Sequence, residues 1–184
     1  MKTRINSRPI GQLLRQKNYI AWIMYGLSAL LVVVLQSAPR FFPPIFYARP
    51  LPIVAFVICA AVLGGARTGA AVGVWSGILW GVFSFRLFGF DALVLMLFGL
   101  VAGLLVEWYL RANFYTSLLL SAGGILLHVL IEWVFCFVIF QKENLAETLY
   151  RVLLPNALYT FLLTPLMFGL SYLIARIVRR FSNS

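Results

Sequence analysis

Apolar residues run along this chain in long blocks that polar and charged residues interrupt only briefly. A helix needs about 20 mostly apolar residues to cross the hydrocarbon core of a bilayer. Six blocks come close to that length: residues 18–37, 50–66, 68–84, 91–110, 115–140 and 155–178. The pattern predicts an all-α, polytopic membrane protein built as a bundle of six transmembrane helices.

The composition agrees with this prediction. Of the 184 residues, 62% are hydrophobic and only 11% are charged, which is more apolar than a soluble domain of ordinary composition. The tracts outside the six blocks are too short to bury a core of their own. We therefore expect one membrane domain over residues 1–184, with an N-terminal tail at 1–17 and a short C-terminal tail.

The charge distribution predicts the orientation in the membrane. Six passes place both termini on one side together with Arg67 and Arg111, and that side then carries ten of the 15 Lys and Arg residues. By the positive-inside rule the termini face the cytoplasm. Anionic lipid is the partner expected for this excess of basic residues. Nucleic acid is not expected, because the basic residues form no stripe or known binding module.

The third apolar block carries a glycine at every fourth position: Gly69, Gly73, Gly77 and Gly81. Each glycine lowers helix stability by about 1 kcal/mol relative to alanine, so four of them need a reason. In lipid, helices associate through close approach of their backbones, which small residues four apart permit. The spacing predicts a glycine ridge at a helix contact, either inside the bundle or between subunits.

We expect the helix with this ridge to lie at the centre of the bundle. Pairs of small residues in two other blocks are candidates to pack on it: Ala60 with Gly64 or Ala61 with Gly65 in the second, and Gly99 with Gly103 in the fourth. These pairs cannot all face one ridge. At least one pair is therefore expected to be free to receive a helix from a bitopic partner or from a second copy, with Gly64 or Gly99 as the position to test, and a homodimer is predicted.

One histidine and one acidic residue lie deep in the fifth block. His128 and Glu132 are four residues apart, so they share a helix face and can hydrogen-bond. A structural polar pair at a helix contact and a role in proton or substrate handling both remain open. Cys136 continues the row, but successive positions four apart rarely converge on one ion. We therefore expect no metal and no cofactor.

Catalytic patterns are missing from the sequence. The stretch "GVWSG" around Ser76 lacks the glycine spacing of a nucleophile elbow. No serine has a spacing that pairs it with His128, and no phosphate-binding loop or paired carboxylates are present. The sequence predicts a protein that is not an enzyme.

The sixth block and the loop before it carry further local signals. Asn144 followed by Glu147 predicts the start of a short interfacial helix. Asn156 opens the sixth block, and Pro165 within it predicts a kink. The arginines near the C-terminus share one face and are expected to meet phospholipid headgroups or a cytoplasmic partner: Arg176, Arg179 and Arg180.

Residues 49–180 resemble the MreD family of rod-shape-determining membrane proteins. The resemblance lies in the order and spacing of five stretches: "ARPLPIVAFVI", "RTGAAVGVWSGILWG", "RLFGFDALVLMLFGLVAG", "LLHVLIEWVF" and "LLPNALYTFLLTPLMFGLSYLIARIVRRF". It implies a non-enzymatic, multi-pass scaffold of the cell-elongation machinery in the bacterial cytoplasmic (inner) membrane. Such a scaffold would bind the bitopic protein MreC and, through it, link cytoskeletal filaments to peptidoglycan synthases, so controlling cell shape.

The sequence departs from the family at one position. Members often carry an aspartate near the end of the third span, where this chain has Trp80 and Gly81. The family fold is also similar to the six-helix substrate-binding components of energy-coupling-factor vitamin transporters. A small-molecule-binding component of that kind is the alternative function. Fold similarity alone does not transfer function.

Overall fold

The computed structural model describes residues 10–37, 51–84, 89–140 and 154–182. Within these ranges the fold is all-helical. The helices are α1 (Ile10–Ser37), α2 (Pro52–Gly64), α3 (Ala66–Ser84), α4 (Phe90–Trp108), α5 (Phe114–Phe140) and α7 (Leu154–Ser182). Each predicted block overlaps one of them. The helix predicted to begin near Asn144 lies outside the described residues.

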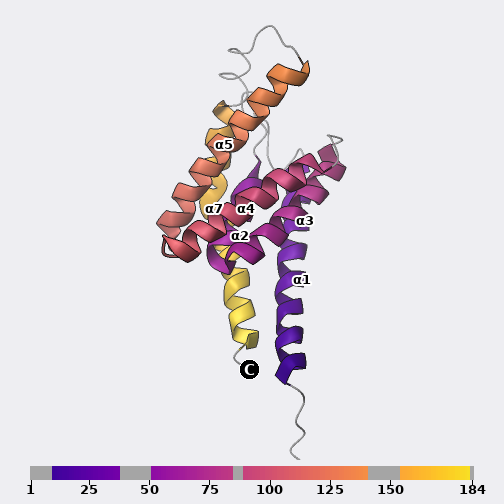
Figure 1. The fold of residues 1–184 in the computed structure, drawn as a ribbon, viewed down its shortest axis with the longest axis vertical. Coiled ribbons are helices and arrows are strands. Elements are labelled where there is room, and N and C mark those ends of the chain that lie inside the picture. Colours follow the sequence, from indigo (N-terminus) through magenta and orange to yellow (C-terminus); the bar gives the residue numbers. More distant parts are fainter. Residues whose placement is uncertain (1–9, 38–50, 85–88, 141–153, 183–184) are drawn as a thin grey trace, which may run out of the picture.

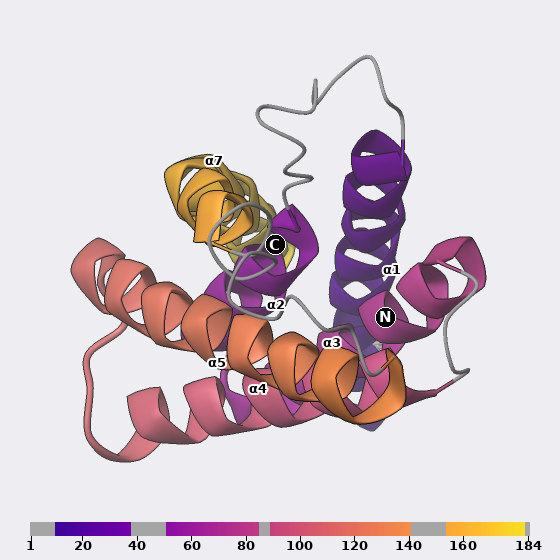
Figure 2. The same ribbon diagram turned by 90° about the horizontal axis from the view of Figure 1, so that it is seen from above.

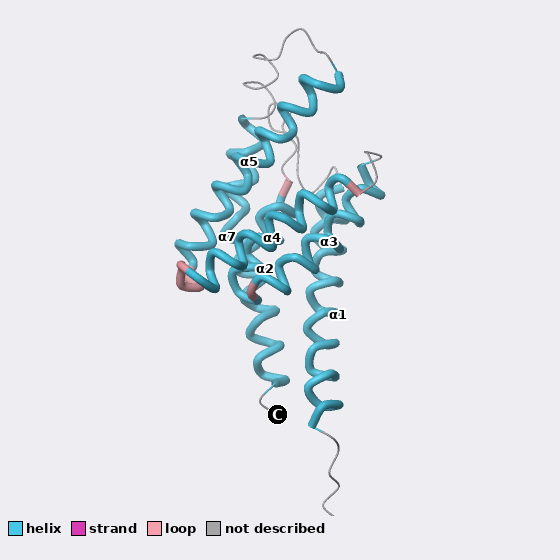
Figure 3. Tube along the Cα trace, in the orientation of Figure 1, coloured by secondary structure: helices cyan, strands magenta, loops and turns pink. Residues whose placement is uncertain are grey.

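Successive described helices rise and fall in turn in Figure 1, with α1 close to the long axis and α3 and α4 strongly oblique to it. As a result, the start of α1 and the end of α7 lie at the same end. Short loops join α2 to α3 and α4 to α5 (Figure 3). The helix α1 begins at Ile10, well inside the tail predicted at residues 1–17. The boundary between tail and membrane span stays a prediction, because a helix can continue past the end of an apolar block.

Three helical stretches among the described residues are long and apolar enough to cross a membrane: Phe90–Trp108, Phe114–Val134 and Leu154–Val178. Trp22–Ser37 and Pro52–Gly64 are apolar but shorter. These helices indicate a membrane protein, and the count of six spans stays a prediction.

The centre of the bundle is α2. Every residue from Pro52 to Val62 is buried, and α2 contacts α1, α3, α4, α5 and α7. Figure 2 shows it enclosed by these helices. The expectation that the third helix is central is therefore wrong. A helix that is apolar all round can be packed on all sides, as α2 is, whereas α3 leaves Trp75, Val82 and Phe83 about half exposed.

The glycines of α3 lie against α4, which runs beside it (Figure 1). A Cβ atom added to Gly69 would clash with the Gly99 carbonyl oxygen and with the Ala61 Cβ. One added to Gly73 would clash with the Leu95 carbonyl oxygen, and one added to Gly77 would clash with Ala92 Cα. Backbone therefore meets backbone along this seam, and no side chain fits between the helices.

The small residues of α4 complete the same contact. A Cβ atom on Gly99 would clash with the Gly69 carbonyl oxygen, and one on Gly103 would clash with Ala66 Cα. Gly99 is thus occupied by α3, and of the two positions expected to receive another chain only Gly64 stays a prediction. Gly64 is exposed, but an added Cβ would lie 2.7 Å from the side chain of Thr68 in the first turn of α3. A Cβ on Gly81 meets none of the described residues within 4 Å, so Gly81 is not part of the seam.

Candidate functional site

Polar side chains from α5 and α7 meet at the start of α2. His128 and Glu132 of α5 and Asn156 and Thr160 of α7 line one small cavity of about 10 Å³. Its apolar walls come from Leu51, Val54, Ile125, Val129 and Ala157. The structure thus brings the His128 and Glu132 pair together with Asn156, three residues that the sequence pointed to separately.

The first turn of α2 is held by side chains of other helices. The Thr160 hydroxyl accepts a hydrogen bond from Leu51 N at 3.0 Å and donates one to the Asn156 carbonyl at 2.8 Å. The Gln36 side-chain oxygen of α1 accepts from Ile53 N at 3.3 Å. A helix that starts inside a bundle has backbone N–H groups without helical partners. Thr160 and Gln36 satisfy two of them.

The electrostatics of the cavity follow from the direction of α2. The N-terminus of a helix carries a partial positive charge, which favours negative charge nearby. Glu132 lines the cavity at that end of α2. His128 is 9% exposed and packs edge-on against Phe98 of α4, with ring centroids 6.2 Å apart. The cavity therefore places an acidic side chain beside the first turn of α2.

The cavity volume limits the chemistry. A cavity of about 10 Å³ is at the lower bound for one water molecule, and pockets for small organic ligands measure roughly 300–1,000 Å³. The Asn156 side-chain oxygen is buried and has no hydrogen-bond partner among the described residues, so a single water could donate to it. Among the described residues, no group of three His, Cys, Asp or Glu side chains could hold a metal ion. The Cys136 side chain lies outside that part of the chain.

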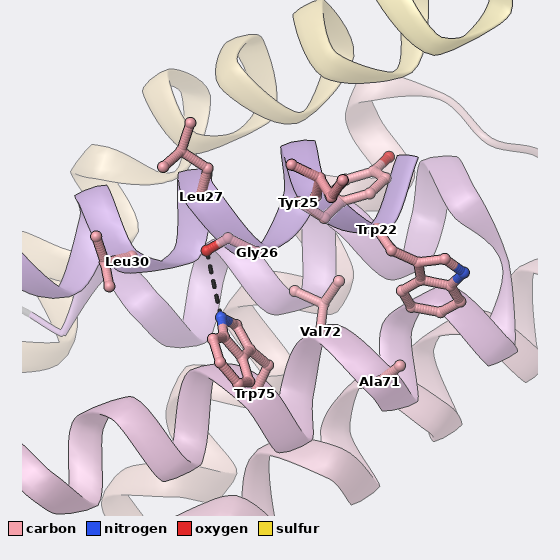
Figure 4. Close-up of a pocket in the computed structure, with 9 residues that line it drawn as sticks. Trp22, Tyr25, Gly26, Leu27, Leu30, Ala71, Val72 and Trp75 are labelled. Atoms are coloured by element: carbon pink, nitrogen blue, oxygen red, sulfur yellow. Dashed lines mark hydrogen bonds between the residues drawn. The ribbon is translucent and has the colours of Figure 1, made fainter. Parts of the chain in front are cut away.

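A second, larger space opens between α1 and α3. It is a groove of about 590 Å³, and Figure 4 shows most of the residues that line it: Trp22, Ile23, Tyr25, Gly26, Leu27, Leu30, Ala71, Val72 and Trp75. The Trp75 indole N–H donates to the Gly26 carbonyl at 3.3 Å. Ile23 and Leu27 on its α1 side are 67% and 66% exposed. The groove is apolar and open on the outer surface of the bundle.

The structure places Pro165 inside a helix. It also places a buried acidic residue near the region where family members often carry an aspartate. Pro165 lies inside α7 with its side chain exposed, and it lacks the N–H that would bond to the preceding turn. The region of Trp80 and Gly81 has no carboxylate of its own. However, Asp91 in the first turn of α4 is 5% exposed, and its carbonyl lies 2.7 Å from a Cβ placed on Gly77. A buried acidic residue thus lies near the end of α3, supplied by α4.

The sequence did not predict three residues that hold the starts of helices. Thr160 and Gln36 hold the start of α2, and Glu107 of α4 accepts a hydrogen bond from Ala66 N at 2.8 Å, at the start of α3. The spacing of Thr160 four residues after Asn156 could have indicated a shared polar face. Nothing in the sequence near Gln36 or Glu107 points to the helix start that each one contacts.

No family model, curated protein or solved structure matches this chain.

Proposed function

We propose that this protein is a non-enzymatic scaffold of the bacterial cell-elongation machinery. In this proposal it spans the cytoplasmic membrane six times with both termini in the cytoplasm, forms a homodimer, and binds the transmembrane helix of an MreC-like bitopic protein. Through that partner it links cytoskeletal filaments to peptidoglycan synthesis. The proposal starts from the resemblance of residues 49–180 to the MreD family.

The groove between α1 and α3 is the observation that carries the proposal. It lies between two helices that run side by side, with Gly26 and Ala71 among its lining residues, so a third helix can approach closely there. The Trp75 N–H is already bonded to the Gly26 carbonyl, so this donor needs no polar group from a molecule bound in the groove. An apolar single-pass helix fits these properties better than a soluble ligand does.

The polar cavity supports a structural role for His128, Glu132 and Asn156. Thr160 and Gln36 show that polar groups around the start of α2 serve to satisfy its backbone. A cavity of about 10 Å³ has no room for a substrate. We therefore propose that this cluster fixes α2 in place and does not bind a transported molecule.

The alternative, a vitamin-binding component of a transporter, requires a pocket with several converging polar groups. The groove has the volume for a small ligand, about 590 Å³. Its lining is mostly aliphatic and aromatic, which makes it a poor site for a polar vitamin.

Co-purification distinguishes the two functions. The protein would be expressed with an MreC-like bitopic partner, extracted in mild detergent and examined by native mass spectrometry. The scaffold proposal predicts a retained single-pass protein. A monomer that carries a small organic molecule and no partner would overturn it in favour of the transporter alternative.

The proposed orientation has a separate test. Single cysteines at Ser182 and at Lys142 would be labelled in intact cells with a reagent that does not cross the membrane. We expect labelling at residue 142 and none at residue 182. Labelling at residue 182 would overturn the cytoplasmic placement of the termini.

A further inference from the structure

A basic and aromatic surface lies where the start of α3 meets the end of α4. Glu107 in the last turn of α4 accepts a hydrogen bond from Ala66 N at the start of α3. Arg67 follows Ala66 directly, and Arg111 comes one turn's length after Glu107, in the loop to α5. The hydrogen bond therefore brings together the two segments that carry these arginines.

Both arginines are exposed. Neither guanidinium makes a hydrogen bond or ion pair with the part of the chain that the structure describes. The nearby carboxylate, Glu107, is already engaged by the α3 backbone, where it complements the positive end of that helix. Two guanidinium groups thus remain available at this surface, and guanidinium binds phosphate oxygens in a bidentate geometry.

Exposed aromatic residues lie within four residues of Arg111 in the sequence. Trp108, Tyr109 and Tyr115 are 75%, 79% and 81% exposed, and amphipathic aromatic rings prefer the level of the lipid headgroups. Phe114 packs edge-on against Phe168 of α7 at 5.3 Å between ring centroids, which ties the loop to the bundle. Leu104, Leu110 and Phe114, in and near the loop between α4 and α5, are also exposed and can contact an acyl chain.

From these observations we propose that Arg67 and Arg111, together with Trp108, Tyr109 and Tyr115, form a binding site for the headgroup of an anionic phospholipid. A phosphate carried by a lipid suits this surface better than a soluble phosphate, because exposed aromatic and aliphatic side chains flank Arg111 along the chain. The site is distinct from the α1 and α3 groove. It rests on the proposed membrane insertion but not on the proposed partner protein.

The test uses the full-length protein in nanodiscs of equimolar dioleoyl phosphatidylglycerol and phosphatidylcholine, with retained lipids counted by native mass spectrometry. The wild type is expected to retain phosphatidylglycerol in preference to phosphatidylcholine. R67Q/R111Q is expected to weaken phosphatidylglycerol binding about thirtyfold, and R111Q alone about fivefold, since one arginine contributes about a factor of five at a membrane surface. R67K/R111K, which keeps the charge and loses the bidentate geometry, should fall between these values.

The matched control is R40Q/R49Q, which removes two charges from the segment predicted to lie on the opposite side of the membrane. It is expected to leave phosphatidylglycerol binding unchanged. Equal retention of both lipids by the wild type, unchanged binding in R67Q/R111Q, or an equal loss in R40Q/R49Q would each overturn the site. Full competition by soluble glycerol 3-phosphate would assign it to a soluble phosphate instead. A protein that does not enter nanodiscs would contradict the proposed membrane insertion itself, a failure that this experiment separates from loss of lipid preference.

Discussion

On one side of α3, Gly69, Gly73 and Gly77 bring the helix backbone against α4 with no space for a side chain. On the other side, Ala71, Val72 and Trp75 form the wall of an open groove with α1. Residues of the two faces alternate in the sequence between Gly69 and Gly77. The comparison indicates that close backbone contact fixes the fold on one face, so that the other face can stay open without loss of stability.

The largest expected effect is at the seam. Replacing Gly73 by alanine places a methyl group against the Leu95 carbonyl and forces α3 and α4 apart. We expect a loss of about 3 kcal/mol, which lowers the thermal unfolding midpoint in detergent by about 10 °C. The control is Gly81→Ala, because a Cβ there meets nothing among the described residues. A similar midpoint for both variants would contradict the seam.

A smaller effect is expected at the polar cavity. Glu132→Leu removes a polar group from the cluster around the start of α2, at a cost of about 1–3 kcal/mol, or a fall of roughly 3–9 °C. Glu132→Gln keeps hydrogen-bonding capacity and should remain near the wild-type midpoint. If Glu132→Gln abolished partner binding as fully as Glu132→Leu while the protein stayed folded, the charge of Glu132 would have a role beyond structure.

The cap of α2 gives a smaller effect still. Thr160→Val keeps the shape of the side chain but loses the hydroxyl that Leu51 N donates to. We expect a loss of about 1 kcal/mol, typical of a removed helix cap, and a midpoint lower by about 2–4 °C. Thr160→Ser restores the hydroxyl and should recover most of this. Equal thermal unfolding midpoints for Thr160→Val and Thr160→Ser would show that this cap contributes nothing to stability.

The sequence predicted the helices well and their arrangement less well. Long apolar blocks define where helices form in a membrane, and each block overlaps one of the described helices. The position of α2 at the centre was missed because its uniformly apolar surface is equally consistent with lipid contact. Hydropathy does not distinguish a residue that faces lipid from one that faces another helix.

The glycine spacing identified small-residue contacts without identifying which helix would occupy them. Gly99 and Gly103 were expected to compete with α2 for the ridge, and in the structure both face α3 while Ala61 of α2 also touches Gly69. The choice depends on crossing geometry, which a spacing of four residues does not specify. The capping of α2 was missed for a similar reason, because Gln36 and Thr160 are far apart in sequence and each bonds the first turn of α2 only in the folded bundle.

The central claim is that α3 has one structural face and one binding face, and a pair of matched substitutions tests it most directly. Ala71→Leu fills the groove, and Gly77→Leu, six residues further on, enters the seam beside Ala92. Thermal unfolding and partner retention would be measured on both variants, co-expressed with the bitopic partner. The account predicts that Ala71→Leu keeps the wild-type midpoint within about 2 °C and loses the partner, whereas Gly77→Leu fails to fold. Equal stability of the two variants, or full partner retention by Ala71→Leu, would contradict it.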